Sequence, residues 1–178
     1  PDADLSALET DGRSYAEVAE ALAPSSRFGG EAPSHDELAL VGESMRLAPS
    51  ADTGQTWRFV MLVGREATTA ALEAAGIEVK VEEAPGVLVA VLAAPFIIKH
   101  RNREQPFALI DHPIALTHGV LVAEALGLRW SVAFDFDFEQ TRAAVGAPQD
   151  HKATALLALD RKGERAEAPF PPLCQLRR

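Results

Sequence analysis

The segment Ala108–Leu126 constrains the fold of this chain more than any other part of the sequence. It is the longest apolar stretch with helical character, and Gly127 marks its end. Because apolar residues occur nearly all round this helix, we expect it to be buried at the centre of the domain or in a subunit interface. Pro113 predicts that the helix begins near that residue or is kinked there.

A second constraint comes from Val87–Ala94, an uninterrupted apolar run that predicts a strand covered on both faces. Further strands are predicted at Trp57–Val63, Arg129–Phe138 and Ala153–Asp160. Helices are predicted between and before them, at Ser14–Ala23, from a capping box at Ser34–Glu37 up to Pro49, at Glu66–Ala75 and at Glu139–Val145. This order predicts an α+β domain whose helices cover both faces of a central sheet.

Length and composition are those of one globular domain. We expect residues 1–178 to form a single unit, with 1–13 and 166–178 as extended termini. The net charge of −9 argues against nucleic-acid binding, and no apolar run is long enough to span a membrane. Cys174 is the only cysteine, so no intrachain disulfide can form, and the first residues carry no signal-peptide pattern. These features favour a cytoplasmic protein.

A polar loop within Leu47–Phe59 is the strongest candidate for a functional segment. Pro49 ends the preceding helix, and Ser50, Asp52, Thr53 and Gln55 place donors and acceptors between two apolar elements. Loops on a rigid scaffold often hold polar ligands. The alternative is a simple connector, because these are ordinary loop residues.

Other patterns give weaker signals. The histidines have no metal-ligand spacing with Asp or Glu, and the serines lack the context of a nucleophile, so we assign neither a metal site nor a catalytic side chain. The alternation in Phe134–Phe138 predicts a strand edge with one apolar face, with an aromatic wall facing a substrate as the alternative.

Several blocks, taken together, resemble the nitroreductase-like flavoproteins. The first is Ala48-Pro49-Ser50-Ala51 followed by Gln55, Trp57, Arg58 and Phe59, which matches the family's Ala-Pro-Ser loop and its Gln-Pro-Trp-Arg-Phe strand start. The second is Ala123–Leu128, which is similar to the family's Ala-x-x-Leu-Gly-Leu helix end. Val145–Pro148 follows where the family has Leu-Gly-x-Pro. The similarity covers most of Leu22–Gly163.

This resemblance implies a three-layer α/β/α sandwich with a central mixed sheet and an intertwined homodimer. It also implies two FMN sites at the dimer interface, each built from both subunits. In the reaction so implied, NAD(P)H reduces the flavin, which then reduces a nitro compound, a quinone or a similar small acceptor. The cofactor supplies the redox chemistry, which suits a chain without an evident catalytic side chain.

The resemblance assigns cofactor contacts residue by residue. Pro49, Ser50, Ala51, Thr53 and Gln55 match the loop that the family lays against the flavin, with Thr53 in place of the usual Asn and Thr56 in place of Pro. Phe134 and Asp135 stand where a backbone N–H of the family approaches the flavin ring, and Arg129-Trp130 replaces a small Gly-Ser pair.

The chain departs most from the family where the flavin phosphate is held. The family's arginine cluster falls on Leu22–Ser26, so Ser26 and Arg27 remain for the phosphate, with Arg177 or Arg178 as further cations from the tail. A degenerate relative that has lost FMN and serves as a dimeric binding or structural protein is therefore the alternative.

Overall fold

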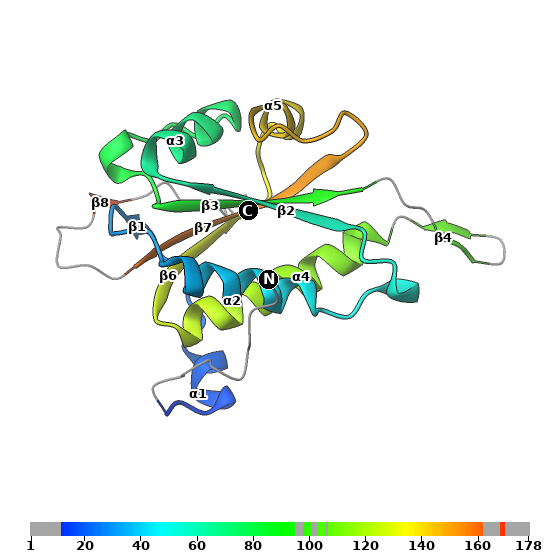
Figure 1. Ribbon diagram of the computed structural model, residues 1–178, viewed down its shortest axis with the longest axis horizontal. Helices are drawn as coiled ribbons and strands as arrows, with labels where there is room; N and C mark the ends of the chain where they lie inside the picture. Colours follow the sequence, from blue (N-terminus) through cyan, green and yellow to red (C-terminus); the bar gives the residue numbers. More distant parts are fainter. Residues whose placement is uncertain (1–11, 95–97, 101–102, 106, 162–167, 170–178) are drawn as a thin grey trace, which may run out of the picture.

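The protein has three layers in the computed structural model, which describes residues 12–94, 98–100, 103–105, 107–161 and 168–169 (Figure 1). A sheet forms the middle layer. Helices α3 (Arg65–Ala74) and α5 (Phe138–Ala144) cover one face, and α2 (His35–Arg46) and α4 (Ala108–Ala125) cover the other. Helix α1 (Tyr15–Glu20) packs against α4. The predicted α/β/α sandwich is confirmed.

The central sheet has the strand order β2–β3–β7–β6, and each neighbouring pair is antiparallel. Its strands are β2 (Trp57–Val63), β3 (Val87–Ala93), β6 (Leu128–Ala133) and β7 (Lys152–Arg161). The expectation of a mixed sheet is therefore wrong for the described strands. After α3 the chain returns to the end of β2, where Gly64 N–H donates to Gly86 O at 2.9 Å, so β3 must run in the opposite direction.

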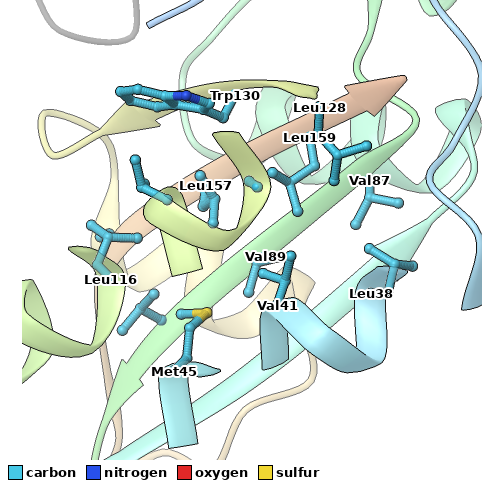
Figure 2. Packing of buried hydrophobic residues seen from close by; sticks show 14 residues of the cluster. Leu38, Val41, Met45, Val87, Val89, Leu116, Leu128, Trp130, Leu157 and Leu159 are labelled. Carbon is cyan, nitrogen blue, oxygen red and sulfur yellow. The ribbon is translucent and has the colours of Figure 1, made fainter. Parts of the chain in front are cut away.

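Alternate residues of the inner strands pack into two separate cores. Val87, Val89 and Val91 of β3 pack with the α2–α4 layer, part of which is shown in Figure 2. Leu88, Ala90 and Leu92 pack instead with α3 and α5. The side chains point alternately to the two faces because the strand repeat is two residues. An unbroken apolar run therefore requires helices on both sides, as the sequence predicted.

Helices α2 and α4 pack against each other at a glycine. A Cβ atom on Gly119 would lie 2.7 Å from Cγ and 2.8 Å from Sδ of Met45, and Met45 is fully buried. Such distances are shorter than a van der Waals contact, so only glycine permits this spacing. Pro113 lies inside α4 and not at its start, because the helix begins at Ala108.

The predicted strand Arg129–Phe138 ends early. Strand β6 stops at Ala133, and Asp137 caps α5 by accepting a hydrogen bond from Gln140 N–H at 2.9 Å. The alternation of Phe and Asp is therefore a turn followed by a helix cap, and the interpretation as a strand edge is wrong.

The remaining elements are short. Strand β1 (Arg27–Phe28) pairs with β8 (Ala168–Pro169), and β4 (Ile98–His100) pairs with β5 (Arg103–Gln105). Ala51–Thr53 and Val81–Glu83 each form a single helical turn.

No helix within the described residues has both the length and the apolar character needed to cross a membrane.

The capping box predicted at Ser34 is present and is tied to the end of β7. Ser34 Oγ accepts from Glu37 N–H at 3.3 Å, and Ser34 N–H donates to Glu37 Oε2 at 2.7 Å. Arg161 adds two contacts, from Nε to Oε2 at 2.9 Å and from Nη2 to Oε1 at 2.8 Å. Burial by itself would raise the pKa of Glu37, but the hydrogen bonds from Arg161 and Ser34 outweigh it and the pKa is lowered.

We predict that Glu37→Gln lowers the free energy of unfolding by about 1 kcal/mol at neutral pH, because charge-assisted bonds to Arg161 are lost. A carboxyl group with a lowered folded-state pKa stabilises the fold above its unfolded pKa and loses this effect as the pH falls through the folded value. The difference from the wild type should therefore shrink between about pH 5 and pH 3. Urea unfolding measures the difference in the free energy of unfolding, with Asp36→Asn as the exposed control. A difference that does not change with pH would contradict the lowered pKa of Glu37.

Candidate functional site

The polar loop after α2 has a strained backbone. Asp52, Thr53 and Gln55 have positive φ angles of 50°, 53° and 42°, although none is glycine. The left-handed conformation costs a residue with a side chain about 1–2 kcal/mol, and a β-branched residue such as Thr53 adopts it rarely. Strain of this kind persists where the surroundings fix the backbone, and it is concentrated at functional sites.

Hydrogen bonds fix this loop in place. Ser50 Oγ accepts from Gln55 N–H at 3.1 Å, and the Gln55 side-chain amide donates to Arg46 O at 3.3 Å. The third bond connects the loop to another element, because Ala51 N–H donates to Asp111 Oδ1 at 3.1 Å from the first turn of α4. The predicted site residues Pro49, Ser50, Ala51, Thr53 and Gln55 therefore form one loop that is anchored on α4.

Polar side chains are buried beside this anchor. Asp111 and His112 are each 2% exposed, and neither Asp111 Oδ2 nor His112 Nε2 has a hydrogen-bond partner in the described part of the chain. His112 Nδ1 lies 2.9 Å from Thr154 Oγ1, which itself donates to Val91 O at 3.1 Å, so we assign the ring proton to Nδ1. Burial lowers the pKa of His112 more than the Thr56 backbone and Asp111 raise it. The imidazole is therefore neutral at neutral pH.

An apolar hollow lies on the opposite side of α4, against β6. Its volume is about 360 Å³, and it includes Phe134, one of the predicted site residues. Phe134 is 49% exposed, and Asp135 beside it is exposed as well. The full lining is Leu22, Pro24, Pro113, Leu116, Thr117, Val120, Trp130, Val132 and Phe134. The lining residues contribute no charged side chain to the hollow.

The segment before β1 borders this hollow but directs its polar residues elsewhere. Ser25 N–H donates to Trp130 O at 2.7 Å, which fixes the segment against β6. Ser25 Oγ donates to Arg27 O at 2.9 Å and so closes a local turn. Ser26 and Arg27, which the sequence assigned to a phosphate, are both exposed.

A buried carboxylate fixes the chain that follows Arg27. Asp160 Oδ2 accepts from Gly29 N–H at 2.8 Å and from Gly30 N–H at 2.7 Å, and Oδ1 accepts from Gly86 N–H at 3.0 Å. Burial raises the pKa of Asp160 in spite of these three donors. A Cβ atom on Gly30 would lie 2.2 Å from Arg161 O, so the backbone can approach only at a glycine. The position of Arg27 therefore depends on Asp160.

Within one chain, the predicted phosphate residue Arg27 and the predicted loop Ser50–Gln55 lie apart. Asp160 and Gly86 lie at the end of the sheet where Val63 pairs with Val87, and the loop precedes Trp57 at the other end (Figure 1). Strand β2 has seven residues, which places the two ends about 20 Å apart at roughly 3.3 Å per residue. Arg177 and Arg178 lie outside the described residues.

No role was predicted from the sequence for Asp111, Glu124, Trp130 or Asp160. Each is a polar or aromatic residue inside an otherwise apolar element, and that is the signal by which it could have been found. A charged side chain in a buried helix needs a partner, but the sequence does not reveal which loop supplies it.

Several solved structures that match this fold are described as nitroreductases or nitroreductase family proteins. A nitroreductase family protein from Clostridium novyi NT is 21% identical, with 85% of this chain and 87% of that chain covered and a TM-score of 0.73. One from Clostridium difficile 630 is 18% identical, with coverages of 88% and 89% and a TM-score of 0.75. A nitroreductase with bound FMN from Bacteroides fragilis NCTC 9343 is 20% identical, with coverages of 93% and 97% and a TM-score of 0.66.

The sequence comparison agrees with this fold. A sequence model described as the nitroreductase family matches residues 25–159. The chain belongs to the nitroreductase family. None of the curated proteins compared with it matches. The predicted family is thus confirmed.

We predict that Asp111→Ala speeds hydrogen exchange at the Ala51 amide about tenfold or more, because the loss of a carboxylate acceptor costs about 1.5–3 kcal/mol and each 1.4 kcal/mol corresponds to a factor of ten. Asp111→Asn keeps a side-chain oxygen acceptor and should change exchange much less. Exchange measured by NMR or mass spectrometry reads this directly, with Glu139→Ala on α5 as the control. Equal exchange in the wild type and Asp111→Ala would show that the loop does not depend on this anchor.

Proposed function

We propose that this protein is an FMN-dependent oxidoreductase that uses NAD(P)H to reduce a quinone, a nitro compound or a similar small acceptor. The observation that carries the proposal is the strained loop Ser50–Gln55, anchored on α4 at Asp111, in a chain of the nitroreductase family. The B. fragilis neighbour holds FMN, and another neighbour is described as FMN-dependent. Both support a flavin as the ligand.

The separation of the two groups of site residues supports a site shared between two chains. Asp160, which holds the chain that follows Arg27, and the loop lie at opposite ends of β2, about 20 Å apart. In a homodimer, the loop of one subunit would meet the Arg27 segment of the other. Leu109 and Ile110, at the start of α4 beside Asp111, are 70% and 44% exposed. An apolar surface of this kind next to a site favours a subunit contact.

The residues present fit the ring of the cofactor better than its phosphate. The Ser50 hydroxyl, the Thr53 hydroxyl oxygen as an acceptor and the Gln55 amide oxygen can serve the polar edge of a flavin, and Phe134 offers an apolar contact. The resemblance assigns the phosphate to Arg27 and to arginines of the tail, and of these only Arg27 lies within the described residues. Its guanidinium can bind two phosphate oxygens at once.

The overall reaction balances without a catalytic side chain. NAD(P)H gives up two electrons and one proton, a second proton comes from water, and a quinone becomes a hydroquinone while NAD(P)H becomes NAD(P)⁺. FMN, when bound, supplies the redox chemistry that links the two half-reactions. The loop Ser50–Gln55 would orient the ring.

The alternative is a dimeric binding or structural protein that has lost FMN. One observation favours it: Leu22 and Pro24, where the family has arginines, line an apolar hollow and add no positive charge. Whether the purified protein binds FMN distinguishes the oxidoreductase from the binding or structural protein.

We expect the purified protein to show the visible absorption bands of bound flavin, or to acquire them when FMN is added and the excess removed. It should then oxidise NADH or NADPH in the presence of a quinone, and its mass in solution should be twice 19.0 kDa. Colourless protein that does not take up FMN would instead support the binding or structural function.

Arg27→Ala should weaken FMN binding about tenfold or more, because hydrogen bonds to a charged group contribute about 1.5–3 kcal/mol. Lys80→Ala, which removes the same charge from an exposed position, should leave the affinity unchanged. Fluorescence titration of FMN measures both. Equal affinities for Arg27→Ala and the wild type would refute the phosphate role.

Mixed dimers test the shared site. Arg27→Ala chains combined with chains that carry Ser50→Ala and Gln55→Ala should form one intact site and one doubly altered site per heterodimer. If each site uses both subunits, the mixture regains tight FMN binding at one site per heterodimer. If each chain builds its own site, no intact site forms and tight binding does not return.

A further inference from the structure

A buried carboxylate at the end of α4 fixes the ring of Trp130. Glu124, which is 9% exposed, accepts a hydrogen bond at Oε2 from Trp130 Nε1–H at 3.0 Å. Its Oε1 atom lies 3.5 Å from Nη1 of Arg13. Arg13 Nη2 also donates to Glu124 O at 2.7 Å and to Ala125 O at 3.2 Å. The guanidinium therefore caps the last carbonyl groups of α4.

This arrangement overcomes an unfavourable helix position. A carboxylate in the last turn of a helix faces the negative end of the helix dipole, and burial adds a desolvation cost. Arg13 offsets both effects, and the indole N–H satisfies the second oxygen. Trp130 is only 8% exposed, so a change of its rotamer would leave a buried donor and a buried carboxylate oxygen without partners. Each such loss costs about 1–3 kcal/mol, so the indole is a rigid wall.

Trp130 forms one side of the apolar hollow, and Phe134 forms part of its exposed edge. The one hydroxyl group in the lining, that of Thr117, donates to Pro113 O at 2.8 Å. A volume of about 360 Å³ is near the lower end of the range for small-molecule sites, roughly 300–1,000 Å³. The walls therefore suit a flat aromatic ring that brings no polar group into the hollow.

The pyrimidine edge of a flavin does not meet this requirement. It carries carbonyl and N–H groups that need hydrogen-bond partners, and the lining offers too few. The loop Ser50–Gln55, on the other side of α4, supplies such hydrogen-bond partners. The benzo ring of a naphthoquinone has an apolar edge, and it can enter the hollow while the two carbonyl groups remain at the mouth.

We propose that the hollow between α4 and β6 is the acceptor site, that it takes the benzo ring of a fused-ring quinone, and that Trp130, positioned by Glu124, determines this specificity. The reduction of the quinone at this site rests on the proposed function, whereas the binding of the ring in the hollow does not. The sequence supports the idea that Trp130 is particular to this chain, because it stands where the resemblance places a small residue.

Binding can be tested without turnover. Trp57 and Trp130 are the chain's two tryptophans, so Trp57→Phe leaves Trp130 as the only indole. We expect menadione, a methylated naphthoquinone, to quench this emission with a saturable curve, and p-benzoquinone, a single ring, to bind at least about tenfold more weakly. The same protein without bound FMN should give the same result; saturable quenching in the FMN-free protein alone would show that the dimethylbenzene ring of the flavin fills the hollow and would overturn the proposal. Quenching that is linear in menadione, as expected if a second copy of the chain covers the hollow, would overturn the proposal.

Turnover tests the positioning role. Glu124→Ala should raise KM for menadione about tenfold, with less than a threefold change in kcat, and should leave KM for p-benzoquinone unchanged. Glu124→Gln retains an oxygen acceptor for the indole N–H and should restore KM for menadione. Trp130→Ala should abolish the preference for menadione. Circular dichroism and thermal unfolding identify variants that fail to fold, and Trp130→Phe serves as the milder substitution.

The outcomes separate this proposal from the proposed function. Saturable quenching in a protein that never binds FMN would support the ring site and refute the oxidoreductase. A protein that binds FMN and turns over, with the same menadione preference in Trp130→Ala as in the wild type, would refute the ring site and leave the oxidoreductase standing.

Discussion

The structure depends on burying both faces of its central sheet. Strand β3 has no polar side chain, and its alternate residues enter two different cores. One helical layer could cover only half of this apolar surface, and exposing the other half would cost about 25 cal/mol for each Å². The chain therefore needs helices on both sides. This requirement places α4 against the sheet, and the loop and the hollow both lie along α4.

Much of the fold could be predicted from the sequence, because the relevant signals are local. The capping box at Ser34, the apolar run at Val87–Ala94 and the glycine after α4 each fix an element with short-range chemistry. The strand prediction failed at Phe134–Phe138 because Asp137 caps a helix there, and alternation alone cannot separate a cap from a strand. The direction of the strands also escaped prediction, since it depends on how the chain returns after α3.

The candidate site was predictable only in part. The motif around Pro49–Gln55 marked the loop, and the structure shows what holds it: a contact between residues 60 positions apart, Ala51 and Asp111. The resemblance assigned Ser26 and Arg27 to the same cofactor as this loop, and within one chain the length of β2 separates them. Partners across the fold, such as Asp160 with Gly29 and Gly30, leave no pattern in a single sequence.

The contact between Gly119 and Met45 limits how this protein can move. Gly119 has no side chain, and the fully buried side chain of Met45 fills the space between α2 and α4 at this point. A dense contact of this kind resists sliding and separation. An incoming molecule therefore meets α2 and α4 at a set separation, and room at this contact can be made only by displacing the buried side chain of Met45.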